Sequence, residues 1–308
     1  MGEKGSNRKS ILMMVASMLI FGTIGIFRRS IPVSSAFLAF SRGMLGSLFL
    51  VIFLCVRKRK GAGKIPRKTA VWLVLSGAAI GFNWILLFEA YNYTTVAVAT
   101  LCYYMQPTIV VLLSPLVFRE RLTVKKTACA AVAIVGMVLV SGVTDAGGWQ
   151  PGSLRGVLSG LGAAVLYSAV VIMNKRIAGV DIWRKTTIQL FTAGAVMIPY
   201  LLATGEFDPG PLSAKTVALL LTVGIIHTGI AYVLYFGSLE GLKAQSAAIL
   251  SYIDPVAALL FSALWLKEQL SAAGIIGAVM IIGSAIVSEI RGRGNKGDPP
   301  ATYDSPDI

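Results

Sequence analysis

Ten long apolar runs follow one another along the chain, separated by short polar or charged linkers. The runs are continuous and lack the period-two alternation of membrane strands, and each comes near the roughly 20 residues that a helix needs to cross a bilayer. The pattern predicts an all-α integral membrane protein of ten transmembrane helices: Ile11–Phe27, Val33–Val56, Ala70–Tyr91, Val96–Phe118, Thr127–Val143, Gly156–Asn174, Thr186–Leu202, Val217–Gly237, Ala244–Leu266 and Ser271–Ser288.

Composition supports a membrane location. Apolar residues make up 56% of the 308 residues and charged residues only 14%, with a mean hydropathy of +0.75. A soluble domain carries about 25% charged residues, so lipid must cover much of this surface. The three cysteines, Cys55, Cys102 and Cys129, fall within apolar runs at irregular spacing, which supports neither a disulfide framework nor a zinc site. We expect a multi-pass protein of the cell membrane with no metal and no cofactor.

The net charge of +14 reflects topology rather than nucleic-acid binding, because the basic residues stand in short clusters between apolar runs. With the N-terminus inside, only five of the 28 Lys and Arg residues fall in outside segments, and a sixth, Arg42, lies within a span. Lys and Arg concentrate on the cytoplasmic side of short loops, so both termini are predicted to be cytoplasmic and no nucleic-acid partner is expected. The five outside residues are Arg28, Arg29, Arg155, Lys215 and Lys267.

An internal repeat organises the chain. Tyr104-Met105-Gln106-Pro107 reappears 148 residues later as Tyr252-Ile253-Asp254-Pro255, and Glu120 and Glu268 each follow 13 residues after the proline. The repeating unit contains five helices, and an odd number turns the second copy upside down in the membrane. Loop charge agrees with this inversion, because the first loop is basic and the second retains little beyond Lys267.

The repeat defines the expected domains. Residues 11–143 form the first five-helix half and residues 154–288 the second, while residues 289–308, rich in Gly, Pro and charge, form a disordered cytoplasmic tail. Inverted repeats are a recurring transporter architecture, with the substrate site near the midplane where the halves meet.

These motifs resemble the EamA-domain branch of the drug/metabolite transporter superfamily. The resemblance is carried by Gln106-Pro107 followed by Glu120-Arg121-Leu122-Thr123, by Asp254-Pro255 followed by Glu268, and by the five-plus-five arrangement. It implies a ten-helix carrier of metabolites, often an exporter of amino acids or related compounds, which works by alternating access around a cavity lined by the third, fourth, eighth and ninth helices. A glycine that often precedes the loop glutamate is replaced here by Arg119 and Lys267, which we expect to alter loop charge and not class.

Ionisable residues within spans cost about 2.5–3.5 kcal/mol at a helix centre, so they are candidates for function. Asp254 can bind a cationic substrate group or take up a proton, or else stay neutral or pair with Arg42. His227, the only histidine, can bind substrate or relay protons, or hold helices together as a neutral ring. Arg42 can hold a substrate carboxylate, although its role as a counter-ion is the commoner one for buried charges.

Uncharged candidates complete the predicted site. Tyr252 and Tyr104 stand at mid-depth beside the repeat prolines and can stack on a substrate, as can Tyr103, Trp84 and Tyr232, though aromatic residues also pack helices. Gln106 and Asn83 are hydrogen-bonding contacts between helices at least as often as ligands. The predicted substrate-binding set is Asp254, His227, Tyr252, Tyr104, Gln106, Asn83 and Arg42.

The sequence therefore predicts a secondary transporter of a small molecule and not an enzyme. It has no phosphate-binding Gly-rich loop, which excludes ATP-driven transport by this chain alone, and export rests on the resemblance. Proton coupling, uniport and exchange fit equally well, and the oligomeric state is open. A flippase of a lipid or lipid-linked substrate is the alternative, and a membrane-embedded enzyme is a weaker one, because nucleophiles and metal ligands do not cluster.

Overall fold

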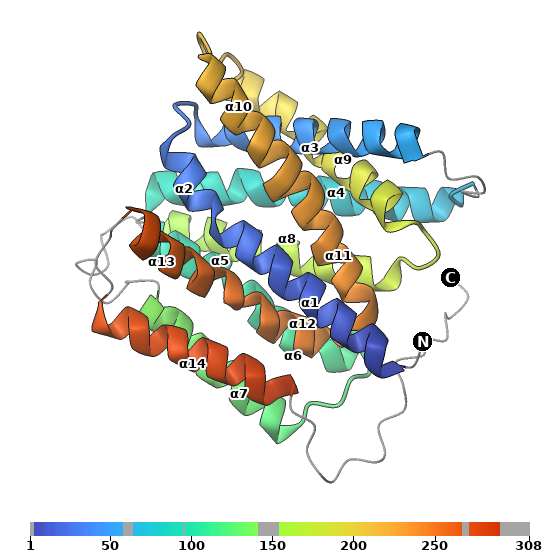
Figure 1. Cartoon of the computed structure of the whole chain (residues 1–308), viewed down its shortest axis with the longest axis vertical. Helices are drawn as coiled ribbons and strands as arrows, with labels where there is room; N and C mark the ends of the chain where they lie inside the picture. The colour runs from blue at the N-terminus through green and yellow to red at the C-terminus, as the bar shows by residue number, and fades with distance from the viewer. Residues whose placement is uncertain (1–2, 58–63, 95, 141–153, 267–270, 290–308) are drawn as a thin grey trace.

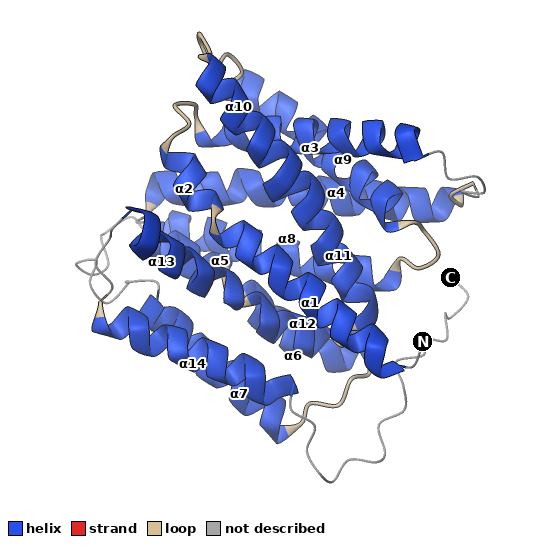
Figure 2. Cartoon of the chain, in the orientation of Figure 1, coloured by secondary structure: helices blue, strands red, loops and turns tan. Residues whose placement is uncertain are grey.

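The computed structural model describes residues 3–57, 64–94, 96–140, 154–266 and 271–289, and within these ranges every regular element is a helix (Figures 1 and 2). The helices lie side by side in one bundle, with α7 and α14 packed together along one edge and α3 and α9 at the opposite side (Figure 1). Within each helix the backbone donors and acceptors bond to one another, which is what lipid requires of a spanning segment. The prediction of an all-α membrane protein is confirmed.

The helices of the two halves follow the predicted spans closely. The first half holds α1 (Glu3–Gly22), α2 (Ile24–Arg29), α3 (Ser35–Arg57), α4 (Arg67–Tyr93), α5 (Val96–Tyr103), α6 (Gln106–Phe118) and α7 (Val124–Val140). The second half holds α8 (Leu154–Arg176), α9 (Ile182–Thr204), α10 (Ala214–Thr222), the π-helical segment η1 (Val223–Ile230), α11 (Ala231–Gly241), α12 (Ala244–Ser251), α13 (Ile253–Leu266) and α14 (Ala272–Glu289).

Eight helical stretches of the described chain are long and apolar enough to cross a membrane. Four of them consist of more than one element: α1 with α2, α5 with α6, α10 with η1 and α11, and α12 with α13. The two remaining helices, α7 and α14, are 17 and 18 residues long and pack against each other. The predicted end of the fifth span at Val143 lies outside the described residues, as do the loop from Lys267 to Leu270 and the tail from Ile290.

Two spans are broken at equivalent positions of the repeat. The fourth span is interrupted between Tyr103 and Gln106, and the ninth at Tyr252. Pro107 and Pro255 follow these breaks by a few residues. Proline has no N–H to donate to the carbonyl four residues before it, so each interruption is explained by the proline beyond it. The repeat identified in the sequence therefore appears in the structure as a pair of matching breaks.

A third break has no proline near it. The first span is interrupted at Thr23, whose N–H bonds to the carbonyl of Ile20 at 3.1 Å, a tight three-residue turn. Across from it, the eighth span widens into the π-helical segment η1. The predicted spans Ile11–Phe27 and Val217–Gly237 treated both as continuous α-helices, and the structure corrects this.

Close backbone packing joins the two halves at α7 and α14. A methyl group at Gly277 would lie 2.5 Å from the carbonyl oxygen of Gly136, and one at Gly136 would lie 2.8 Å from that of Gly277. Small residues let membrane helices approach this closely, so that van der Waals contact can replace the hydrophobic drive that lipid removes.

Gly277→Leu is expected to lower the stability of the protein by about 1–3 kcal/mol, the usual cost of overpacking, because the new side chain meets backbone that cannot move aside. The matched control is Gly283→Leu on the same helix, where a methyl group meets nothing within 4 Å. The melting temperature of detergent-purified protein measures both. Equal melting temperatures for the two variants would contradict the close approach of α7 and α14.

Candidate functional site

Asp254 lies in the first turn of α13, just after the break in the ninth span. The hydroxyl of Tyr104, from the equivalent break in the fourth span, donates a hydrogen bond to Asp254 Oδ2 at 2.9 Å. The two repeat motifs therefore meet each other, and the acid is placed where the two halves join. A carboxylate held by one tyrosine still has acceptor positions for a further donor.

Arg42, on α3, lies over the ring of Trp84 on α4, with its guanidinium carbon 4.6 Å from the ring centroid. Its Nε atom is buried and has no hydrogen-bond partner in the part of the chain that the structure describes. Asp254 and Arg42 do not pair with each other in the described part of the chain, because Asp254 is bonded to Tyr104 and the guanidinium of Arg42 lies over the ring of Trp84. A buried cationic donor without a partner is costly, and a carboxylate satisfies it best.

Four tyrosines connect these two charged groups, and we call them the tyrosine cluster: Tyr103, Tyr167, Tyr232 and Tyr235. Tyr103 lies close enough to interact electrostatically with both Arg42 and Asp254. Tyr235 interacts in the same way with Asp254, and Tyr232 with Arg42. Ring centroids are 6.0 Å apart for Tyr103 and Tyr167 and 6.2 Å apart for the stacked pair Tyr167 and Tyr235. The cluster gives the site aromatic faces and hydroxyl groups side by side.

Sequence reasoning found only part of this cluster. Tyr103 and Tyr232 were candidates, but Tyr167 and Tyr235 were not. Tyr235 stands three residues after Tyr232 on α11, which is the spacing that places two side chains on one helix face, and this signal could have identified it. Tyr167 sits in an otherwise apolar stretch of α8, where the sequence carries no comparable signal.

Three of the predicted residues make contacts between helices. The hydroxyl of Tyr252 is 2.8 Å from Thr108 Oγ1, and its ring packs with residues of α7 and α14. The backbone carbonyl of Gln106 accepts a hydrogen bond of 3.1 Å from Ser168. Asn83 donates to the carbonyl of Ala163 at 2.6 Å, leaving its own Oδ1 without a partner. These contacts hold α4, α6 and α8 around the site.

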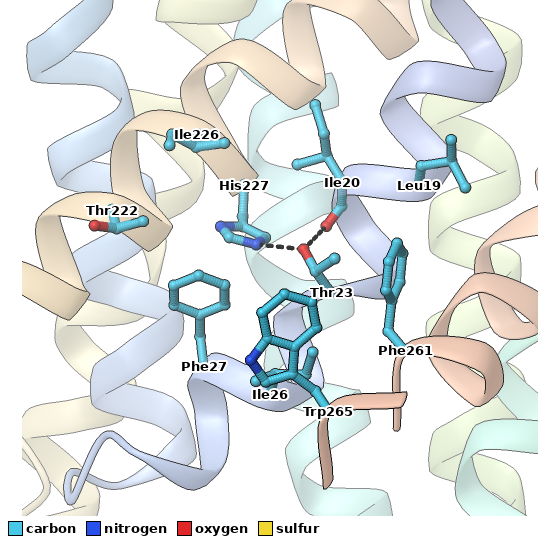
Figure 3. Close-up of a pocket in the computed structure, with 10 residues that line it drawn as sticks. All are labelled: Leu19, Ile20, Thr23, Ile26, Phe27, Thr222, Ile226, His227, Phe261 and Trp265. Carbon is cyan, nitrogen blue, oxygen red and sulfur yellow. Dashed lines mark hydrogen bonds between the residues drawn. The ribbon is translucent and has the colours of Figure 1, made fainter. Parts of the chain in front are cut away.

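His227 lies in a different environment from Asp254. It is 3% exposed and belongs to η1, and its Nε2 is 2.8 Å from the hydroxyl of Thr23 (Figure 3). Phe27 meets the imidazole edge on, with ring centroids 4.6 Å apart. The surrounding pocket is lined by residues of α1, α2, α10, η1 and α13.

A polar network closes one end of the bundle. Glu120, in the loop between α6 and α7, accepts hydrogen bonds from the backbone N–H groups of Ala244 and Gln245 at 2.8 and 3.3 Å. These are the first residues of α12, so the carboxylate caps a helix N-terminus of the other half. Gln245 also donates to Ser114 at 2.8 Å and Lys126 to Ser246 at 3.0 Å.

A buried lysine lies near the same end. The sequence placed Lys185 in a charged linker, but α9 begins at Ile182 and the side chain is 0% exposed. Its Nζ donates to the carbonyls of Asn174 and Ile177 at 2.8 and 3.2 Å and lies 3.8 Å from Glu240. Lys185 therefore fixes the turn between α8 and α9 by binding its open carbonyl groups.

Matching helix breaks at the junction of two similar halves, with buried charged and aromatic groups between them, define a membrane transport protein. The model of the EamA-like transporter family matches residues 8–142 and again residues 154–289. The chain belongs to this family, with one repeat in each half. The resemblance drawn from the repeat motifs is confirmed, as is the multi-pass membrane location.

Several similar proteins are known, and two of the three described below are named as transporters. An uncharacterized transporter, YxxF of Bacillus subtilis (strain 168), is 28% identical over 94% of this chain and 93% of its own length. Protein PecM of Dickeya dadantii (strain 3937) is 31% identical over 70% of this chain and 71% of its own. The aromatic amino acid exporter YddG of Ancylobacter novellus is 26% identical over 76% of this chain and 80% of its own length. The family and the names of YxxF and YddG indicate a transporter rather than an enzyme.

A solved crystal structure supports the fold independently. It superimposes with a TM-score of 0.79, covers 90% of this chain and 97% of its own, and is 22% identical in sequence. At this identity the likeness concerns the arrangement of helices alone.

Proposed function

We propose that this protein is a secondary transporter that exports aromatic amino acids or related zwitterions by alternating access. The buried Nε of Arg42, which has no hydrogen-bond partner among the residues that the structure describes, is the observation that carries the proposal. Arg42 binds the substrate carboxylate, the tyrosine cluster holds the aromatic part, and Asp254 binds the ammonium group. The name of one relative, an aromatic amino acid exporter, agrees with this substrate class.

We further propose that residues 11–143 and 154–288 form ten spans as two oppositely oriented halves, with both termini in the cytoplasm. Three observations support it: the matching breaks of α5–α6 and α12–α13, the separation of basic residues between the loops, and the reciprocal contacts of Tyr104 and Tyr252 with the other half. In a protein with two inverted halves, each half can adopt the conformation that the other had. This exchange opens one central site first to one side of the membrane and then to the other.

Cysteine labelling tests this orientation. With the three native cysteines replaced by serine, Asp208→Cys is expected to react with a membrane-impermeant maleimide in intact cells, and Lys64→Cys only after permeabilisation. Both positions are exposed and lie in linkers on opposite sides in the proposed topology. Labelling of both variants in intact cells, or of neither, would rule out the proposed orientation.

Transport by the purified protein tests the function. Proteoliposomes loaded with unlabelled tryptophan, tyrosine or phenylalanine are expected to accumulate the labelled compound by counterflow, whereas glutamate and lysine give little signal because their side chains carry a charge into the tyrosine cluster. Liposomes without protein are the control. Movement of a fluorescent lipid with no counterflow of any amino acid would instead favour the flippase alternative.

A further inference from the structure

The turn between α11 and α12 is held from both sides by opposite charges. Glu120 accepts hydrogen bonds of 2.8 and 3.3 Å from the first two backbone N–H groups of α12. From the other side, the ammonium group of Lys175 donates to the carbonyl of Leu239, at 3.1 Å, and to that of Leu242, where α11 ends. An anion on open N–H groups and a cation on open carbonyls are both favourable at helix ends. We call this arrangement the turn clamp.

The turn clamp joins the two halves of the protein. Glu120 belongs to the first half and Lys175, in the last turn of α8, to the second, and the two charges attract each other. Lys175 Nζ also lies 5.7 Å from the centre of the Phe118 ring at the end of α6, where a cation and an aromatic face attract. Lys175 therefore binds the main chain of its own half while it faces a side chain of the other.

Paired polar side chains continue the contact beyond the turn clamp. Gln245 donates to Ser114 at 2.8 Å and Lys126 to Ser246 at 3.0 Å, so α12 is bonded to both α6 and α7 of the first half. Ser114 is 0% exposed, Gln245 1% and Ser246 6%. Since these side chains are buried against one another, α6 and α12 are closed together at this end of the bundle.

The internal repeat gives this contact a counterpart at the opposite end. The offset of 148 residues relates α5 to α12 and α6 to α13, so the pair α6 and α12 corresponds to the pair α13 and α5. Over the described lengths of these helices, α6 packs closely on α12, but α5 and α13 do not pack closely on each other. Tyr103, Tyr104 and Asp254, beside the second pair, stay partly exposed. The bundle is therefore closed at the end of Glu120 and looser at the opposite end.

We propose that the turn clamp is the gate at this end of the transport pathway, and that release of α12 by Glu120 converts the described state into one that is open there. This rests on the alternating access proposed above. Glu120 and Lys175 touch no substrate in this role, because they act by positioning the first turn of α12. In the proposed orientation the gate is cytoplasmic, so its opening admits the solute that an exporter carries.

A cysteine buried behind the turn clamp reports its opening. With the three native cysteines replaced by serine, Ser114→Cys is reacted with a water-soluble maleimide in purified full-length protein in phosphatidylcholine nanodiscs. Glu120→Ala removes the carboxylate and is expected to speed this reaction about 3- to 30-fold, as for a lost helix cap. Arg121→Ala, at an exposed position of the same loop, is the matched control and should leave the rate unchanged. Equal rates in the two variants would overturn the gate.

A second reporter separates opening of the gate from loss of the fold. Ser284→Cys lies on α14, where the native serine is 5% exposed and bonds to the carbonyl of Ile281 in its own helix. Opening of the gate speeds the reaction at Ser114→Cys alone, whereas a loosened protein reacts faster at both positions. Equal acceleration of the two reporters by Glu120→Ala would show a purely structural role and would contradict the proposal.

The cation has its own conservative pair of variants. Lys175→Met keeps the length of the side chain and removes its charge, and we expect Ser114→Cys to react about 3- to 30-fold faster in this variant. Lys175→Arg keeps a charged donor for the carbonyls of α11, and a rate within about 3-fold of wild type is expected. Reaction at the wild-type rate in Lys175→Met would remove Lys175 from the gate. If Lys175→Met does not fold, the comparison of Glu120→Ala with Arg121→Ala still decides.

Counterflow is measured separately, so the gate and the proposed function can fail independently. Faster labelling of Ser114→Cys in Glu120→Ala, together with no counterflow of any aromatic amino acid by the wild type, would reject the substrate class and retain the gate. Counterflow by the wild type, together with labelling that Glu120→Ala leaves unchanged, would retain the transporter and reject the gate.

Discussion

Arg42→Gln is expected to raise the substrate concentration that gives half-maximal counterflow about 100-fold. A hydrogen bond to a charged group contributes about 1.5–3 kcal/mol, and the guanidinium offers its donors as a fork that a carboxylate fills. Arg42 Nε has no hydrogen-bond partner among the described residues, so in the proposed site the substrate carboxylate meets a donor that is already desolvated.

The conservative variant and a modified substrate distinguish binding from structure. Arg42→Lys keeps the charge without the fork, and an intermediate loss of about 10-fold is expected. Tryptophan amide, which has no carboxylate, should be moved equally by the wild type and Arg42→Gln. A variant that loses both substrates alike has lost its fold or its cycle instead, and wild-type counterflow in Arg42→Gln would remove Arg42 from the site.

Asp254→Asn is the second large effect, and transport is expected to fall below detection while insertion and melting temperature stay close to wild type. Asparagine has the size of aspartate and retains an oxygen for the hydroxyl of Tyr104, so the contact between the halves survives. The negative charge that binds the substrate ammonium does not.

Two comparisons make the second prediction specific. Tyr104→Phe removes the hydrogen bond of 2.9 Å but leaves the carboxylate, and a loss of no more than about 10-fold is expected. Indole-3-propionate, which lacks the amino group, should bind wild type and Asp254→Asn with similar affinity in a thermal-shift assay. If Asp254→Asn exports tryptophan normally, the acid serves packing and the proposed ammonium site is wrong.

Much of the fold could be predicted because lipid imposes simple rules on a sequence. Continuous apolar runs located the helices, and the breaks before Gln106 and at Tyr252, which the predicted spans Val96–Phe118 and Ala244–Leu266 did not include, are explained by the prolines that follow them. The break at Thr23 and the π-helical segment could not be predicted, because no residue type there forbids an α-helix. They depend on how α1, η1 and α13 fit together.

The charged residues of the candidate site could be predicted from the sequence, but the side chains that they contact could not. Arg42 and Asp254 stand out in apolar spans, and the natural expectation is that opposite charges pair. The structure instead places Arg42 over the ring of Trp84 and bonds Asp254 to Tyr104, and nothing in the sequence singles out these partners among its 5 tryptophans and 10 tyrosines. His227 likewise bonds to Thr23, 204 residues away, which no local pattern indicates.

The cap that Glu120 places on α12 has a consequence for how easily the molecule changes state. This carboxylate joins the two halves at one end, so the contact must break whenever they separate there. A helix cap contributes about 0.5–2 kcal/mol, and 1.4 kcal/mol alters a population ratio about tenfold. Thermal energy is therefore enough to open this contact, and its strength contributes to how the protein divides its population between the two states.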